Sequence, residues 1–127
     1  MTNLDTLFKA LSRSAFRNKF HLQGNDLVYL HTKGLPTVIV HAREFIAKRL
    51  SPAVIQNDGR QTPYRGHPVF VAQHATACCC RNCLEKWHKI PHGRKLTVDE
   101  EAYILTVLER WFHNELGKPS YIDPPAR

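Results

Sequence analysis

Apolar side chains recur at helical spacing along most of this chain, and glycine and proline residues separate one patterned segment from the next. In the clearest case, Pro36-Thr37 opens a segment that ends at Ser51-Pro52, because the residue before a proline avoids helical backbone angles. Its apolar residues share one face of a helix: Val38, Ala42, Phe45, Ile46 and Leu50. This spacing predicts a mainly α fold.

Four further segments predict helices of their own. The first follows a cap at Thr2 or Asn3 and carries a single apolar stripe, formed by Leu4, Leu7, Phe8, Leu11 and Ala15. Two others run over residues 27–33 and 79–90, and the last extends from a capping box at 97–100 toward Gly117. Residues 69–77 fit a helix or a short extended piece equally well.

The chain length of 127 residues suits one compact domain. We expect a single domain over residues 1–127, with a core from about residue 4 to residue 117 and a loose tail over 118–127. No apolar run approaches the roughly 18–20 residues of a membrane helix, and the first residues lack a signal-peptide pattern. A cytosolic protein without a membrane span is therefore expected, and its oligomeric state stays open.

All four cysteines fall in one short stretch, HATACCCRNCLEKWH, which spans residues 74–88. Three are consecutive, Cys78, Cys79 and Cys80, and Cys83 follows after two residues. Adjacent cysteines are poorly placed to bridge each other, and cytosolic thiols stay reduced. The cluster therefore favours a metal site or reactive thiols over a disulfide framework.

Zinc is the metal that this stretch suggests first, with iron as the alternative. Cys80-x2-Cys83 is a spacing that often supplies two zinc ligands. His88 and His92 follow at knuckle-like distances, and His74 approaches from the other side. Two other interpretations stay open, a buried thiol cluster at a helix start and a redox-active Cys-x-x-Cys pair.

A long loop over residues 51–68 precedes the cysteines and contains proline, glycine and Asn-Asp-Gly. Loops of this length in compact domains are often functional. We expect the part from Gln56 to Pro68 to be ordered and packed against the cysteine helix. Asp58 and His67 are the catalytic candidates here, or the outer partners of a metal ligand. The alternative function is therefore a metal-dependent enzyme of the hydrolase or nuclease type, with its active site between Asp58 and His74.

The formal net charge of +7 and the pI of about 9.5 allow nucleic acid or another polyanion as a partner. Lys9, Arg13 and Arg17 recur every four residues and would form a basic ridge if the first helix extends that far. A solvated face is the other explanation of the same spacing.

The motifs NDGRQTP, GHPVFVAQHATA, CCRNCLEKWH and IPHGRKLT occur here in that order. Together they resemble a small bacterial family known as domain of unknown function 4186, over at least residues 16–111. Cys78 and His92 depart from the family pattern, in which Thr and Lys are usual, and position 78 would lie at the cap of the cysteine helix. The resemblance thus implies His74, Cys80, Cys83 and His88 as metal ligands, with Cys79 as a substitute ligand.

Overall fold

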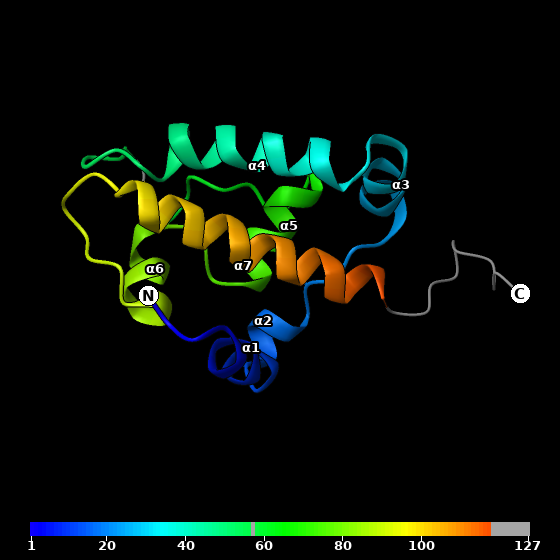
Figure 1. Ribbon diagram of the computed structural model, residues 1–127, viewed down its shortest axis with the longest axis horizontal. Helices are drawn as coiled ribbons and strands as arrows, with labels where there is room; N and C mark the ends of the chain where they lie inside the picture. The colour runs from blue at the N-terminus through cyan, green and yellow to red at the C-terminus, as the bar shows by residue number, and fades with distance from the viewer. Residues whose placement is uncertain (57, 118–127) are drawn as a thin grey trace, which may run out of the picture.

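The computed structural model describes residues 1–56 and 58–117, and these residues contain seven α-helices and no strand (Figure 1). The helices are α1 (Leu4–Ser12), α2 (Ala15–Asn18), α3 (Gly24–Lys33), α4 (Leu35–Arg49), α5 (Pro68–Ala75), α6 (Arg81–His88) and α7 (Val98–Leu116). The mainly α fold predicted from the apolar spacing is confirmed. The expected loose tail over 118–127 lies outside the described residues.

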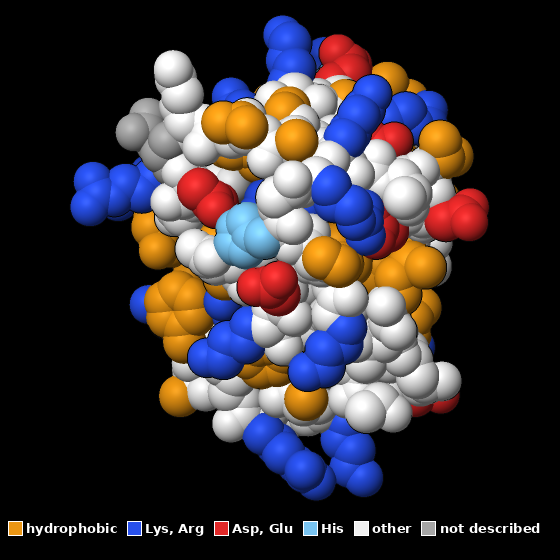
Figure 2. Space-filling model, turned by 90° about the vertical axis from the view of Figure 1, so that its left-hand side faces the viewer, with side chains coloured by type: hydrophobic (Ala, Val, Ile, Leu, Met, Phe, Trp, Pro, Cys, Tyr) orange, Lys and Arg blue, Asp and Glu red, His pale blue; other side chains and the backbone are white. Residues whose placement is uncertain are grey.

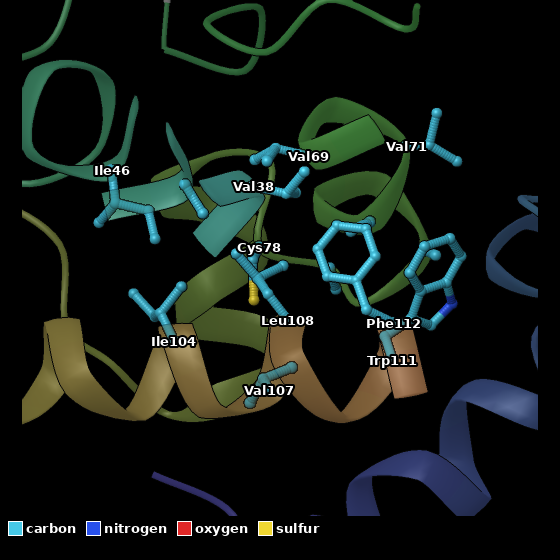
Figure 3. Close-up of a cluster of buried hydrophobic side chains, with 14 of the residues drawn as sticks. Val38, Ile46, Val69, Val71, Cys78, Ile104, Val107, Leu108, Trp111 and Phe112 are labelled. Carbon is cyan, nitrogen blue, oxygen red and sulfur yellow. The ribbon is translucent and has the colours of Figure 1, made fainter. Parts of the chain in front are cut away.

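The two longest helices, α4 and α7, pack side by side and run in opposite directions (Figure 1). The short helix α5 packs against both of them, while α1 and α2 lie on the other side of α7 from α4. Fully buried side chains from α4 and α7 meet in the core, among them Val38, Ile46, Ile104, Leu108 and Phe112 (Figure 3).

Local sequence signals explain where the long helices begin and end. Thr97 and Glu100 form the predicted capping box at the start of α7, each side chain bonding the other's backbone N–H. Gly34 stands between α3 and α4 with φ of +86°, which a residue with a side chain rarely adopts. Pro36 then occupies the first turn of α4, where its missing N–H costs nothing.

The N-terminal segment does not form the continuous helix that a basic ridge requires. α1 ends at Ser12, and Ser14 caps a separate short helix by accepting a hydrogen bond from the Arg17 backbone N–H. Arg17 is buried, so Lys9, Arg13 and Arg17 do not line one exposed face. The ridge prediction is wrong because a serine cap redirects the chain before the third cation.

The sequence does not distinguish a helix from an extended segment over residues 69–77. The reason is that α5, the helix in this segment, has no solvent-exposed face. Every residue of α5 is buried, so polar positions do not mark an outer face. The cysteine helix also starts later than expected, at Arg81, with Cys80 as its N-cap. Cys78 is not at a cap: it is fully buried in the core between the helices (Figure 3).

Among the described residues, no helix combines the length and the apolar character that crossing a membrane requires.

Candidate metal centre

Three of the four thiols converge at the start of α6. The sulfur atoms of Cys79, Cys80 and Cys83 all lie within 4.8 Å of one another. Cys79 and Cys80 end the turn after α5, and Cys83 lies in the first turn of α6, where its backbone N–H donates to the Cys80 sulfur at 3.4 Å. Cys79 and Cys80 are buried and Cys83 is partly exposed. We refer to these three residues as the thiol cluster.

Arg17 brings a positive charge directly onto the thiol cluster. Its guanidinium lies 3.2 Å from the Cys83 sulfur and 3.6 Å from the Cys79 sulfur. The same group donates to the backbone carbonyl of His74 at 2.7 Å. The short helix α2 therefore presents one cation to two sulfurs and to the end of α5.

Negative charge in the thiol cluster concentrates on Cys83. Hydrogen bonds from the thiols of Cys79 and Cys80, together with Arg17, hold the pKa of Cys83 far below its ordinary value. The pKa of Cys79 is raised, because its thiol is hydrogen-bonded to those of Cys80 and Cys83 and because it is buried. A thiolate is the form of cysteine that binds metals, so this arrangement prepares the cluster for a cation.

His74 is linked to the thiol cluster through Arg17, but its ring nitrogens are not among the ligand atoms that lie within 4.8 Å of one another, and one of them is already engaged. Its Nε2 lies 3.1 Å from the carbonyl oxygens of both Thr62 and Pro63, so Nε2 carries the proton and Nδ1 keeps its lone pair. The ring stacks on Tyr64, with centroids 4.1 Å apart. Burial lowers the pKa of His74, which favours the neutral imidazole that a metal ligand requires.

His88 is placed differently, because both of its ring nitrogens have protein partners. Nδ1 lies 2.6 Å from the Tyr103 hydroxyl, and Nε2 lies 2.8 Å from the Thr76 carbonyl and 3.5 Å from the Cys78 sulfur. The side chain is fully buried, and burial lowers its pKa to about 4. His88 and Cys78 thus form a second buried pair, separate from the thiol cluster.

Two described residues of the loop before α5, Asp58 and Thr62, contact the cysteine segment, as expected. The Thr62 hydroxyl donates to the Cys79 carbonyl at 2.7 Å. Asp58 accepts from the backbone N–H of Arg81 at 3.4 Å, and its other oxygen lies 2.7 Å from His92 Nε2. Asp58 therefore bonds the first residue of α6 and lies beside the thiol cluster without being part of it.

His67 has other partners. Its Nδ1 accepts from the backbone N–H of Val69 and caps α5, while its Nε2 lies 3.1 Å from His41 Nδ1. The two catalytic candidates, Asp58 and His67, thus contact different residues within the described part of the chain.

Arg81 fixes the backbone from which the thiol cluster projects. Its buried guanidinium donates to four carbonyls, those of Leu50 at 3.0 Å, Pro52 at 3.2 Å, Pro91 at 2.7 Å and Arg94 at 2.8 Å. One side chain thereby ties the end of α4 and the loop before α7 to the start of α6.

Sequence reasoning missed two features of this site. The sequence predicts Arg17 on an exposed ridge and gives Cys79 only a substitute role. The contacts of Arg17 with the cysteines span more than sixty positions of sequence, so no local spacing could have revealed them. Cys79 could have been favoured from its spacing, since it lies four residues before Cys83, about one helical turn.

The comparisons with known proteins give a family without an assigned activity. No solved structure matches the chain. The family described as "Domain of unknown function (DUF4186)" matches residues 5–113, a segment that includes Arg17, His74 and all four cysteines. This match confirms the resemblance seen in the sequence motifs, and it covers most of the chain. The protein therefore belongs to the DUF4186 family of domains of unknown function.

Proposed function

We propose that this protein binds a single zinc ion through Cys79, Cys80 and Cys83. The observation that carries the proposal is the convergence of three sulfur atoms within 4.8 Å of one another. Thiolates are preferred zinc ligands, and turns followed by a helix start are a common way to supply them.

The sulfur spacing supports one ion rather than an iron–sulfur cluster. Tetrahedral zinc, with Zn–S bonds of about 2.3 Å, places its sulfur ligands about 3.8 Å apart. The limit of 4.8 Å in the thiol cluster is compatible with that separation after small side-chain rotations. A four-iron cluster binds its cysteines through different iron atoms, which spreads the sulfurs further apart.

His74 is the residue that we propose as the fourth ligand, through Nδ1. Its ring nitrogens are not among the ligand atoms that lie within 4.8 Å of one another, so metal binding would draw this ring toward the sulfurs. A histidine that binds a metal usually donates its other ring N–H to a carbonyl or carboxylate, which fixes the tautomer. The carbonyls of Thr62 and Pro63 accept from Nε2 of His74 in this way. His88 is left out of the proposed set because Tyr103 and Thr76 use both of its nitrogens.

Arg17 supports the choice of a divalent ion with three thiolates. Such a centre carries one net negative charge, which the adjacent guanidinium offsets at hydrogen-bond distance from two of the sulfurs. Without the ion, the same cation stabilises thiolate in the cluster, as the lowered pKa of Cys83 indicates. Arg17 therefore serves the site in both states.

Elemental analysis of protein purified without an affinity tag tests the proposal. Cells grown with both zinc and iron should yield about one zinc per chain, and Cys83→Ser and Cys80→Ser should lose it. Cys78→Ala is the matched control, because this adjacent thiol bonds His88 and Thr76 instead of the cluster. It should keep the metal and lower the free energy of unfolding by about 1 kcal/mol.

The outcomes separate zinc, iron and no metal. If stoichiometric iron is found in place of zinc, the identity of the metal in the proposal is wrong but its ligands stand. His74→Ala should weaken binding of whichever ion is present. Wild-type protein without stoichiometric metal, or equal metal content in Cys83→Ser and wild type, would overturn the proposal.

The enzyme alternative receives less support than metal binding, because Asp58 and His67 contact different residues. A polyanion role through the Lys9, Arg13 and Arg17 ridge also loses its basis with the burial of Arg17. On the face that includes α6, Lys and Arg side chains are scattered, with Asp and Glu side chains among them (Figure 2). A nucleic-acid role therefore needs a different surface.

A further inference from the structure

A run of aromatic side chains, exposed at both ends and half-buried in the middle, lies next to the thiol cluster. The rings of Phe16 and Phe20 meet edge to face with centroids 5.2 Å apart, and Phe20 is stacked near Tyr64 at 6.2 Å. Phe16 is 42% exposed and Tyr64 is 62% exposed. We call these three residues the aromatic strip. Contiguous apolar surface of this kind often marks an interaction site.

The aromatic strip is held in place before any partner arrives. Tyr64 stacks on His74 with an angle of 7° between the rings, and Phe20 stacks on the same histidine at 21°. The carbonyls of Thr62 and Pro63 fix the histidine ring through Nε2. A flat ring fixed on one side loses little conformational freedom when another ring stacks on it.

Cations accompany the strip. The Lys19 ammonium lies 4.6 Å from the Phe16 ring centroid and 5.4 Å from that of Phe20. Arg65 follows Tyr64 in the sequence and is exposed, and it lines a pocket together with Asp26 and Tyr29. With a net charge of +7 on the whole chain, this surface suits a partner that carries both flat rings and negative charge.

We propose that the aromatic strip binds single-stranded nucleic acid. Unpaired bases would stack on Tyr64 and, once Lys19 moves from the ring to a phosphate, on Phe16. Arg65 would also contact the phosphates. Exposed ring faces combined with cations are the usual means of binding single strands with little sequence preference. Paired bases keep their faces covered, so a duplex would use only the charges. The proposal does not depend on the identity of the metal.

Fluorescence anisotropy with labelled single-stranded DNA, single-stranded RNA and duplex DNA tests this surface. Tyr64→Ala should weaken single-strand binding by about fivefold to a hundredfold, which corresponds to one lost stacked base. Tyr64→Phe keeps the ring and should bind as wild type does. Val98→Ala, at an exposed valine that begins α7, is the matched apolar control and should change nothing.

The charge contribution has its own pair of variants. Lys19→Ala should lower affinity and reduce the slope of log affinity against log salt by about one. Lys48→Ala is the control, because it removes the same charge from α4, and α4 lies on the other side of α7 from α2 (Figure 1). This variant should leave the salt slope unchanged. The ratio between the DNA and RNA affinities shows which nucleic acid the surface favours.

Circular dichroism and metal analysis of each variant show whether it is folded and retains its metal. In a variant that passes both checks, weaker binding is due to the change in the aromatic strip. Phe16→Ala is a second test of stacking at an exposed site and should also weaken binding. The proposal is overturned if single strands fail to bind at low salt, if folded Tyr64→Ala and Phe16→Ala bind as wild type does, or if duplex and single strands bind equally.

Discussion

Arg17 joins the parts of the molecule that surround the thiol cluster. It donates to the sulfurs of Cys79 and Cys83 and to the carbonyl of His74. Its guanidinium also lies 4.9 Å from the Phe16 ring centroid, at the edge of the aromatic strip. A lysine could supply the charge at this position, but it lacks the planar fork that reaches several acceptors at once.

Substituting Arg17 should therefore weaken metal binding without removing a ligand. Competition with a coloured chelator should show a loss of about tenfold to a hundredfold for Arg17→Ala, as for other partners of metal ligands, and a smaller loss for Arg17→Lys. Arg13→Ala removes an equal charge from an exposed position and serves as the control. Equal affinities of Arg17→Ala and Arg13→Ala would contradict the assigned role.

At the scale of helices, the sequence signals were sufficient where one face is apolar and the ends are marked. The capping box at Thr97 and the proline after Ser51 gave α7 and α4 correctly. The sequence signals failed for α5, which is buried on every side. They also failed at Ser14, which caps the separate short helix α2. Apolar periodicity reveals a helix only where one face is apolar and the other is polar, so it gives no signal for a helix without that contrast.

The start of α6 depends on Arg81 more than on its own short sequence. Replacing this guanidinium by Met leaves four carbonyls without their donor, so the free energy of unfolding should fall by at least about 3 kcal/mol. Urea unfolding measures the change. Arg43→Met, at an exposed position of α4, should alter stability by no more than about 0.5 kcal/mol. A similarly small change for Arg81→Met would show that the hydrogen bonds of Arg81 to these carbonyls contribute little to stability.

At the scale of the whole molecule, long-range contacts decide which candidate residues meet. The sequence correctly located a cysteine cluster at a helix start but could not choose among its histidines. His74 and His88 lie on opposite sides of the cysteines in the sequence, and only the folded chain pairs His88 with Tyr103. The same folding brings Arg17 inward and gives Asp58 and His67 different partners.

Three histidines with lowered pKa values, His67, His74 and His88, should make stability depend on pH. Burial lowers the pKa of His88 to about 4, and burial with the neighbouring His41 lowers that of His67 to about 4, while an unfolded histidine titrates near 6.5. Between these values the unfolded chain binds more protons than the folded one. The free energy of unfolding should therefore fall as the pH drops from 6.5 to 4, by at most about 1.4 kcal/mol per pH unit for each histidine.

Urea unfolding of the Cys83→Ser variant across this range measures the slope without interference from metal release. His67→Asn removes one titrating group but keeps a residue that can cap α5, so it should flatten part of the slope. A free energy of unfolding that is constant from pH 6.5 to 4 would contradict the lowered pKa values of these histidines.

X-ray absorption at the zinc edge tests most directly whether the thiol cluster is a metal centre. Wild-type protein should show three sulfur neighbours at about 2.3 Å and one nitrogen neighbour at about 2.0–2.1 Å. The His74→Ala variant should keep the sulfurs and exchange the nitrogen for a water oxygen. A spectrum with only nitrogen and oxygen neighbours, or with fewer than three sulfurs in the wild type, would contradict a centre built on Cys79, Cys80 and Cys83.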